Sequence, residues 1–183
     1  MKLDKVTVKI NVGSEIGFLK LLGISGSIEL CWGVTKVQQL AAWELYVELV
    51  TRITTVELKQ NEGLIREALS SLYSLFNITR DILRRYGPRV TKPLSRDKLS
   101  FGYIAVLVLN KLLRPFLAKW HPLLTDYENN RSNNVSQFKH EQNWENNNKI
   151  RDELNDELRG PLNQYASLLS KMAGIPEVHE MTS

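Results

Sequence analysis

Two side chains that could act together on a phosphodiester, Arg114 and His121, lie seven positions apart. They frame the segment Arg-Pro-Phe-Leu-Ala-Lys-Trp-His. On a helix, this spacing places both side chains on one face. There the arginine could stabilise the negative charge of a phosphorane, and the histidine could transfer protons. The pair therefore indicates metal-independent RNA cleavage as one hypothesis.

Read as Arg-x(4–6)-His, this eight-residue segment resembles the signature of HEPN-type ribonucleases, which are also helical bundles. The resemblance implies catalytic roles for Arg114 and His121. The sequence departs from the family pattern at Pro115, where a polar residue is common, and Pro122 directly follows the histidine. The alternative is structural: Arg114 caps a helix or pairs with the glutamate-rich last helix, and His121 ends its own helix.

A basic block over residues 80–98 is the second candidate site, with seven basic residues against two aspartates. Arginine suits phosphate groups, and a tyrosine could stack on a base. The alternatives are pairing with the acidic C-terminal third, contact with a protein partner, or a solvated surface. The residues that could bind a partner are Arg80, Arg84, Arg85, Tyr86, Arg89, Lys92, Arg96 and Lys98.

Other chemistries find little support in the sequence. The three histidines lie far apart, and His140-Glu141 fails to match His-Glu-x-x-His because Trp144 occupies the last position. There is no glycine-rich phosphate loop. Glu44 and Glu48 could share a proton, but a solvated stripe in which Glu48 pairs with Arg52, worth about 0.3 kcal/mol, is the simpler interpretation. We therefore expect no metal and no cofactor.

Composition favours one soluble, intracellular domain. The 183 residues are 43% hydrophobic and 24% charged, as in globular proteins. Cys31 is the one cysteine, which excludes an internal disulfide and favours a reducing compartment. The longest apolar run, 101–109, is about half of the roughly 20 residues that a membrane span needs. Charges are scattered over the N-terminus, so we expect no signal peptide, no membrane contact and a cytoplasmic location.

Hydrophobic periodicity predicts a mainly α-helical fold. Alternating apolar residues in 1–35 predict a small β-hairpin or three-stranded meander. Repeats of three and four residues predict helices over 36–59, from Asn61 to Gly87-Pro88, and from about 95 to 120 with a bend at Pro115. Further helix is expected from Ser136 onward, interrupted or kinked at Gly160-Pro161. The aromatic residues expected in the core are Trp43, Tyr46, Tyr73 and Trp120. Phe138 and Trp144 are expected to anchor the helix after Ser136, and Trp32 and Trp144 could instead anchor a partner.

These elements predict a four-helix-bundle-like domain over 36–174, with the β element of 1–35 docked on it. An asparagine-rich connection over about 125–148 and a flexible tail at 175–183 complete the chain. We expect a non-catalytic binding or assembly protein that engages a protein partner or a nucleic acid through the basic block. Segments such as Ala-Ala-Trp-Glu-Leu-Tyr suggest a subunit or adaptor of a multi-protein bacterial system, a group that includes defence systems. Homo-oligomerisation stays open, and the ribonuclease is the alternative.

Overall fold

The structure, a computed structural model, describes residues 6–9, 16–23, 31–52, 58–59, 61–91 and 100–176. The described chain is mostly helical, as the sequence predicts. Its elements in order are β1 (Val6–Lys9), α1 (Ile16–Leu21), β2 (Cys31–Val34), α2 (Lys36–Val50), α3 (Ile65–Tyr86), the 3-10 helix η2 (Gly87–Val90), α4 (Phe101–Leu107), the π-helix η3 (Val108–Leu113), α5 (Arg114–Asn129), α6 (Gln137–Gln142), α7 (Asn147–Glu153), the π-helix η4 (Leu154–Arg159) and α8 (Gly160–Ala173).

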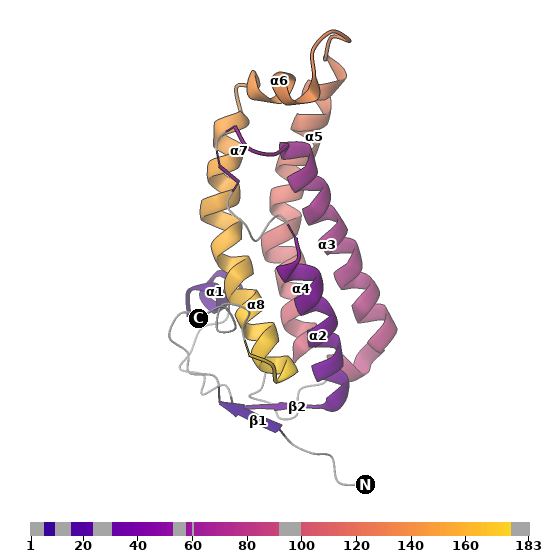
Figure 1. The fold of residues 1–183 in the computed structure, drawn as a ribbon. Helices are drawn as coiled ribbons and strands as arrows, with labels where there is room; N and C mark the ends of the chain where they lie inside the picture. The colour runs from indigo at the N-terminus through magenta and orange to yellow at the C-terminus, as the bar shows by residue number, and fades with distance from the viewer. Residues whose placement is uncertain are drawn as a thin grey trace.

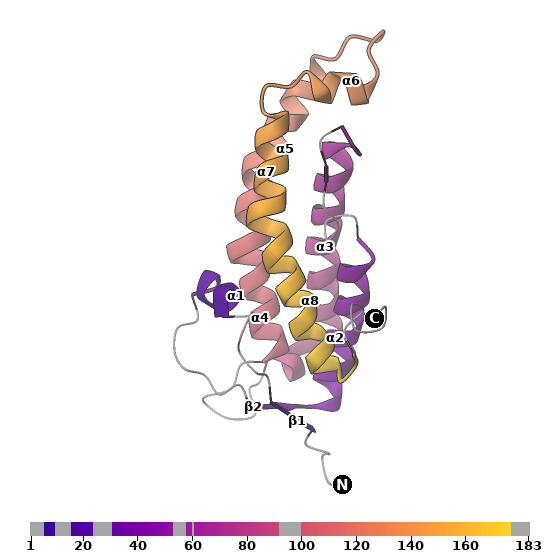
Figure 2. The same ribbon diagram turned by 60° about the vertical axis from the view of Figure 1, so that its left-hand side comes forward.

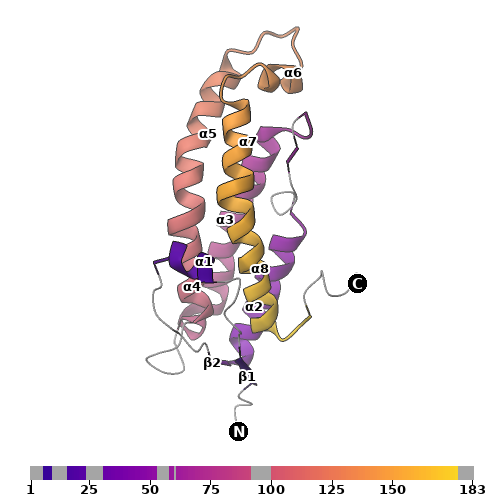
Figure 3. The same ribbon diagram turned by 90° about the vertical axis from the view of Figure 1, so that its left-hand side faces the viewer.

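The long helical segments run along one common axis (Figures 1 and 2). Helix α2 packs between α8 and α3, and α3 packs in turn against α5 and η3. Short helix α6 lies across the end of the molecule farthest from the strands (Figure 3). The core between the helices is filled by large side chains with no more than 1% exposure, among them Trp120, Phe101, Leu69 and Leu45.

Helix α2 begins where the sequence predicts and ends earlier. The Thr35 hydroxyl caps it by accepting a hydrogen bond from the Gln38 amide at 3.3 Å. The predicted helix extends to Lys59, but the observed one ends at Val50, and Leu58 and Lys59 are not helical. Residues 51–56 include five β-branched side chains, which lose rotamer freedom in a helix, and this accounts for the early end.

Helix α3 begins later than predicted. Asn61 is no cap, because its φ of 64° places it in the left-handed region, and the helix starts after Leu64 without a side-chain cap of its own. The predicted end at Gly87-Pro88 is confirmed. Gly87 takes a φ of 61°, a value that favours glycine, and its amide bonds the Leu83 carbonyl.

Three described prolines lie inside continuous helices, and two of them follow a π-helical segment. Pro115 stands two residues after η3, and Pro161 stands two residues after η4. A proline lacks an amide hydrogen and its ring presses on the carbonyl four residues earlier, so a widened π-helical turn upstream relieves both conflicts. The helix that contains Pro115 consequently runs from Phe101 to Asn129. The predicted end near His121 is wrong, because the exposed Pro122 is also tolerated inside α5.

The helix Phe101–Asn129 is long and apolar enough to span a bilayer by those two criteria. However, 56% of its most apolar window is buried in the molecule, as in the central helix of many soluble domains. Phe101, Leu113, Trp120 and Leu124 are each at most 1% exposed. Its apolar character is therefore explained by packing against the other helices.

The described residues among 1–35 do not support the predicted hairpin or meander. Strands β1 and β2 pair antiparallel, with Val6 opposite Val34 and Lys9 opposite Cys31, but α1 lies between them in sequence. The predicted hairpin or three-stranded meander is therefore not supported, and much of it falls on residues 1–5, 10–15 and 24–30, outside the described chain. Phe18 of α1 stacks on Tyr165 of α8, with ring centroids 5.7 Å apart.

A buried polar network fixes the start of α3. The Glu141 carboxylate accepts hydrogen bonds from the Ile65 amide at 2.7 Å and the Arg66 amide at 3.2 Å. These amides would otherwise lack partners at a helix N-terminus, where negative charge is also favoured by the helix dipole. Glu141 is 1% exposed and comes from α6, so the cap that α3 lacks locally is supplied by a distant part of the chain.

Arg151 completes this network from α7. Its guanidinium donates to the carbonyls of Lys59 at 2.8 Å, Glu62 at 2.8 Å and Gly63 at 3.2 Å, in the turn that leads into α3. Its Nε donates to Asn147 Oδ1 at 2.9 Å, and the Asn147 amide group donates to the Glu141 carbonyl at 2.7 Å. Burial lowers the pKa of Arg151, and the nearby charge of Glu141 opposes that effect.

Replacing Arg151 with methionine is expected to lower the free energy of unfolding by about 3 kcal/mol. The change removes the donors of three carbonyls and leaves Glu141 buried without a nearby positive charge. Urea denaturation followed by circular dichroism measures the loss. Lys149→Met, an exposed change on the same helix, is the control and should cost less than about 0.5 kcal/mol. Equal stability of the two variants would contradict the assignment.

Candidate functional site

The basic block is described in its first half. Arg80, Arg84, Arg85 and Tyr86 occupy the last turns of α3, and Arg89 lies in η2. Lys92, Arg96 and Lys98 lie outside the described residues. The end of α3 was predicted correctly, so the four arginines stand at a helix C-terminus, where the helix dipole favours positive charge.

The arginines of the block have few internal partners, and none of those shown comes from the C-terminal third. Arg85 Nη1 lies 2.7 Å from Glu44 Oε1 of α2, and Arg84 Nη1 lies 3.0 Å from Asp81 Oδ1 one turn earlier. Arg84 and Arg85 keep 65% and 61% of their side chains exposed, so both ion pairs are weak surface pairs. Arg80 and Arg89 are exposed and contact no acidic side chain within the described part of the chain.

Tyr86 does not offer an open ring at this surface. It is half-buried and packs against the core. Burial, followed by the neighbouring Glu44 carboxylate, raises the pKa of its hydroxyl above the ordinary value. Stacking of a base on Tyr86, as the sequence suggested, would require the ring to leave this position.

Two of the aromatic residues expected in the core are instead exposed. Trp43 on α2 is 47% exposed and Tyr73 on α3 is 53% exposed. Tyr46 and Trp120 are buried as predicted. Trp144, expected as an anchor of the helix after Ser136 or of a partner, is also buried, while Phe138 is 37% exposed and is a poor anchor. Helices α2 and α3 carry apolar residues over arcs wider than the core can cover. Periodicity alone therefore misplaced Trp43 and Tyr73.

Arg114 and His121 both face α3 but contact different residues there. The Arg114 guanidinium lies 5.9 Å from the centre of the Phe76 ring, and the His121 ring centre lies 6.0 Å from that of Tyr73. Arg114 therefore packs on α3 and not on the last helix, and His121 lies within α5 instead of ending a helix. The two side chains share a face, as the spacing of seven predicts, without forming a pair.

The arginine nearest to His121 is one that the sequence did not single out. Arg66 Nη1 lies 3.4 Å from His121 Nε2. Because a guanidinium only donates, this contact needs the neutral imidazole with its proton on Nδ1. Arg66 also donates Nε to Glu128 Oε1 at 3.0 Å, pairs through Nη2 with the other oxygen of that carboxylate, and reaches Thr125 Oγ1 at 3.1 Å. A guanidinium held in this way is neutralised and fixed in place.

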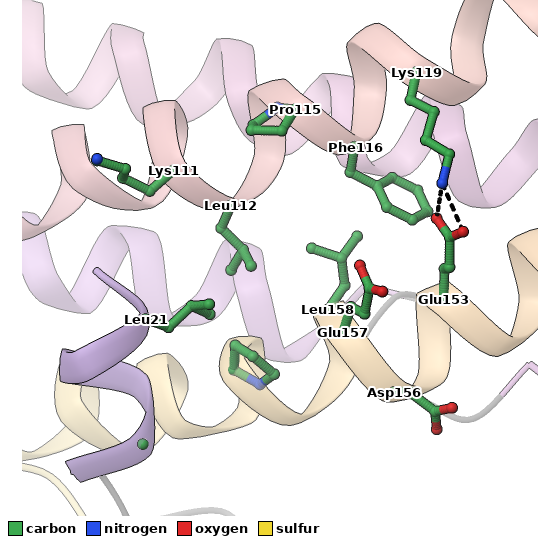
Figure 4. A pocket seen from close by; sticks show the side chains of 12 residues that line it. Leu21, Lys111, Leu112, Pro115, Phe116, Lys119, Glu153, Asp156, Glu157 and Leu158 are labelled. Carbon is green, nitrogen blue, oxygen red and sulfur yellow. Dashed lines mark hydrogen bonds and ion pairs between the residues drawn. The ribbon is translucent and has the colours of Figure 1, made fainter. Parts of the chain in front are cut away.

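A cavity of about 450 Å³ opens between the two π-helical segments. Figure 4 shows Leu112 of η3, Phe116 of α5 and Leu158 of η4 around it, with the ammonium of Lys119 reaching the Glu153 carboxylate. Lys119 Nζ lies 2.6 Å from both Glu153 oxygens, and Trp120 Nε1 donates to Glu153 Oε2 at 2.8 Å. The cavity wall is thus mainly apolar, and an ion pair ties α5 to α7 at its edge.

Metal chemistry has no site in the described chain, where no three His, Cys, Asp or Glu side chains are grouped to hold an ion. The arrangement therefore offers binding surfaces: exposed arginines at one end of α3, an exposed tyrosine beside a histidine, and an apolar cavity. The sequence missed Arg66, Glu128, Glu141 and Arg151, since only tertiary contacts between distant segments reveal their roles.

Glu153→Gln should destabilise the protein by about 1 kcal/mol at neutral pH and much less in acid. Burial tends to raise the pKa of Glu153, but the hydrogen bonds from Lys119 and Trp120 and the charges of Lys119 and Lys149 outweigh it, so the pKa is lowered. A carboxyl with a lowered folded pKa stabilises the fold above its unfolded pKa of about 4.3, and this contribution is lost as the pH falls through the folded value.

Urea denaturation of both proteins between about pH 7 and pH 3 measures this effect. The exposed change Glu145→Gln is the control and should show no such convergence in acid. A stability difference for Glu153→Gln that stays constant over the whole range would contradict the role given to the ion pair.

Comparison of the chain with protein-family models, curated proteins and solved structures gave no match. The function must therefore be argued from the surfaces described above.

Proposed function

We propose that this chain is a non-catalytic binding protein that engages an anionic partner, an acidic protein surface or a nucleic acid, through the arginines at the C-terminal end of α3. The observation that carries the proposal is that Arg80 and Arg89 are exposed and form no ion pair with an acidic side chain in the described residues. Four guanidinium groups over residues 80–89 form a dense positive surface. Arginine binds carboxylate and phosphate in a bidentate manner, so this surface suits either partner.

The distribution of acidic residues supports the same proposal. Glu128, Glu141 and Glu153 of the C-terminal third are engaged by Arg66, by the start of α3 and by Lys119. These contacts lie away from residues 80–89. Among the described residues, none of these three glutamates is placed against the arginines at the C-terminal end of α3.

We further propose a four-helix-bundle-like domain with its N-terminal β element docked at one end, located in the cytoplasm as a subunit or adaptor of a larger bacterial assembly. The single cysteine and the burial of the helix Phe101–Asn129 support a soluble protein in a reducing compartment. RNA cleavage by Arg114 and His121 is less well supported, because each side chain already contacts a different group on α3.

Binding to short anionic probes tests the proposal. A fluorescently labelled single-stranded oligonucleotide and a labelled poly-glutamate peptide are titrated with the full chain at about 50 and 200 mM salt. We expect at least one probe to bind, and its affinity to fall steeply as salt rises. Arg80→Gln and Arg89→Gln should each weaken binding, because each removes one positive charge from the surface.

Arg131→Gln is the matched control, since Arg131 is exposed in the loop after α5, at the other end of the molecule. Absence of binding to both probes, or equal loss in the control, would overturn the proposal. Analysis of the oligonucleotide after incubation separates binding from cleavage: an intact probe supports a non-catalytic role, and cleavage lost in His121→Ala supports the ribonuclease instead.

A further inference from the structure

One surface combines exposed positive charge with an exposed aromatic ring. We define the α3–α5 face by Tyr73, Arg80 and Arg84 of α3 together with Arg114 and His121 of α5. On α3, Tyr73 and Arg80 are seven residues apart and Arg84 follows four residues later, so the three project from the same side of the helix. They extend over about 16 Å of helix.

Tyr73 is the central feature of this face. It is 53% exposed although it lies in the middle of a long, well-packed helix. Its ring lies beside that of His121 at a centroid distance of 6.0 Å and an interplanar angle of 43°. His121 is itself held, through the contact of its Nε2 with Arg66 at 3.4 Å. The tyrosine ring therefore has a supported position with an open side, which is what a stacking platform needs.

Positive charge flanks this ring on both helices. Arg114 lies over Phe76, and Phe76 stands between Tyr73 and Arg80 along α3. Arg80 has no acidic partner among the described residues, and Arg84 is held only by the exposed Asp81. An anionic ligand that passes over Tyr73 toward Arg84 would therefore meet guanidinium groups from α3 on one side and from α5 on the other.

Negative charge is scarce on this face. Helix α5 has no acidic residue from Arg114 to Thr125. On α3 the acidic residues between Arg66 and Arg85 are Glu67 and Asp81. Glu67 lies about 120° or more around the helix from Tyr73 and Arg80, and Asp81, which lies about 80° from Tyr73, pairs with Arg84. The Glu128 carboxylate, which does approach, is occupied by Arg66. Repulsion of an anionic chain is therefore small from Tyr73 to Arg84.

We propose that the α3–α5 face binds single-stranded nucleic acid, with a base stacked on Tyr73 and phosphates held by Arg80, Arg84 and Arg114. This inference rests on the proposed function and narrows it to one partner. An acidic protein would use the arginines but would gain little from an open aromatic ring beside them. A duplex could use the phosphate contacts, but its paired bases are not available for stacking on a side chain.

Fluorescence anisotropy with a labelled single-stranded RNA of about 12 nucleotides tests the inference. Tyr73→Ala should weaken binding about tenfold and leave the salt dependence unchanged, because it removes stacking and no charge. Tyr73→Phe keeps the ring and should bind within about twofold of the unmodified protein. Arg80→Gln should reduce the slope of log affinity against log salt by about 0.7, the value expected for one phosphate contact.

Trp43→Ala is the matched control, since it removes an equally exposed aromatic ring from α2 and should leave RNA binding unchanged. Thermal unfolding should show that Tyr73→Ala is folded, as expected for an exposed side chain. RNA binding that Tyr73→Ala leaves intact, or equal affinity for a duplex of the same sequence, would overturn the inference. Salt-dependent binding that depends on Arg80 but not on Tyr73 would leave the proposed function standing, whereas absence of any anionic binding would remove both.

Discussion

The start of α3 depends on side chains that are supplied almost eighty residues later in the chain. Its first two amides are capped by Glu141, and the turn before it is held by Arg151, both nearly inaccessible to solvent. A buried carboxylate and a buried guanidinium are costly to dehydrate, and each is tolerated because it is bonded on several sides. This network forces α6 and α7 to fold against the N-terminal end of α3, and it thereby sets the position of the longest amphipathic helix in the domain.

The same constraint arranges the charge of the molecule. Glu128 and Glu141 are committed to Arg66 and the start of α3, at the N-terminal end of that helix. The arginines of residues 80–89 lie at the other end, about three helical turns or more away along the axis. Positive charge that the fold does not neutralise is the basis of the binding role proposed above. Arg114 and His121 contact different side chains of α3, Phe76 and Arg66, and are not paired with each other.

The sequence was most informative where structure is decided locally. The helices expected to begin at about Lys36 and near Ser136 do begin there, and Gly87 ends a helix as expected, because capping depends on the adjacent residues. It failed where distant segments decide: Asn61 is not the cap of α3, since Glu141 replaces it. The helix expected to pass through Pro115 does so and extends beyond its predicted end near His121, and the helix at Pro161 is continuous, with a π-helical turn before each of these two prolines. For the site, the sequence located the cluster of arginines but left open whether they are exposed or paired internally, and Tyr73 was assigned to the core because periodicity cannot tell how much of a wide apolar arc is covered.

Arginines near the start of α3 are engaged within the protein, whereas Arg80 and Arg89 near its C-terminal end form no ion pair among the described residues. NMR on the ¹⁵N-labelled protein tests this difference most directly by measuring the solvent exchange of the arginine Nε protons. The Nε groups of Arg66 and Arg151 donate to Glu128 and Asn147, so their protons should exchange slowly. Those of Arg80 and Arg89 should exchange at the rate of an unstructured peptide. Strong protection of Arg80 and Arg89 would show that the basic surface is already occupied within the protein, and would contradict the account.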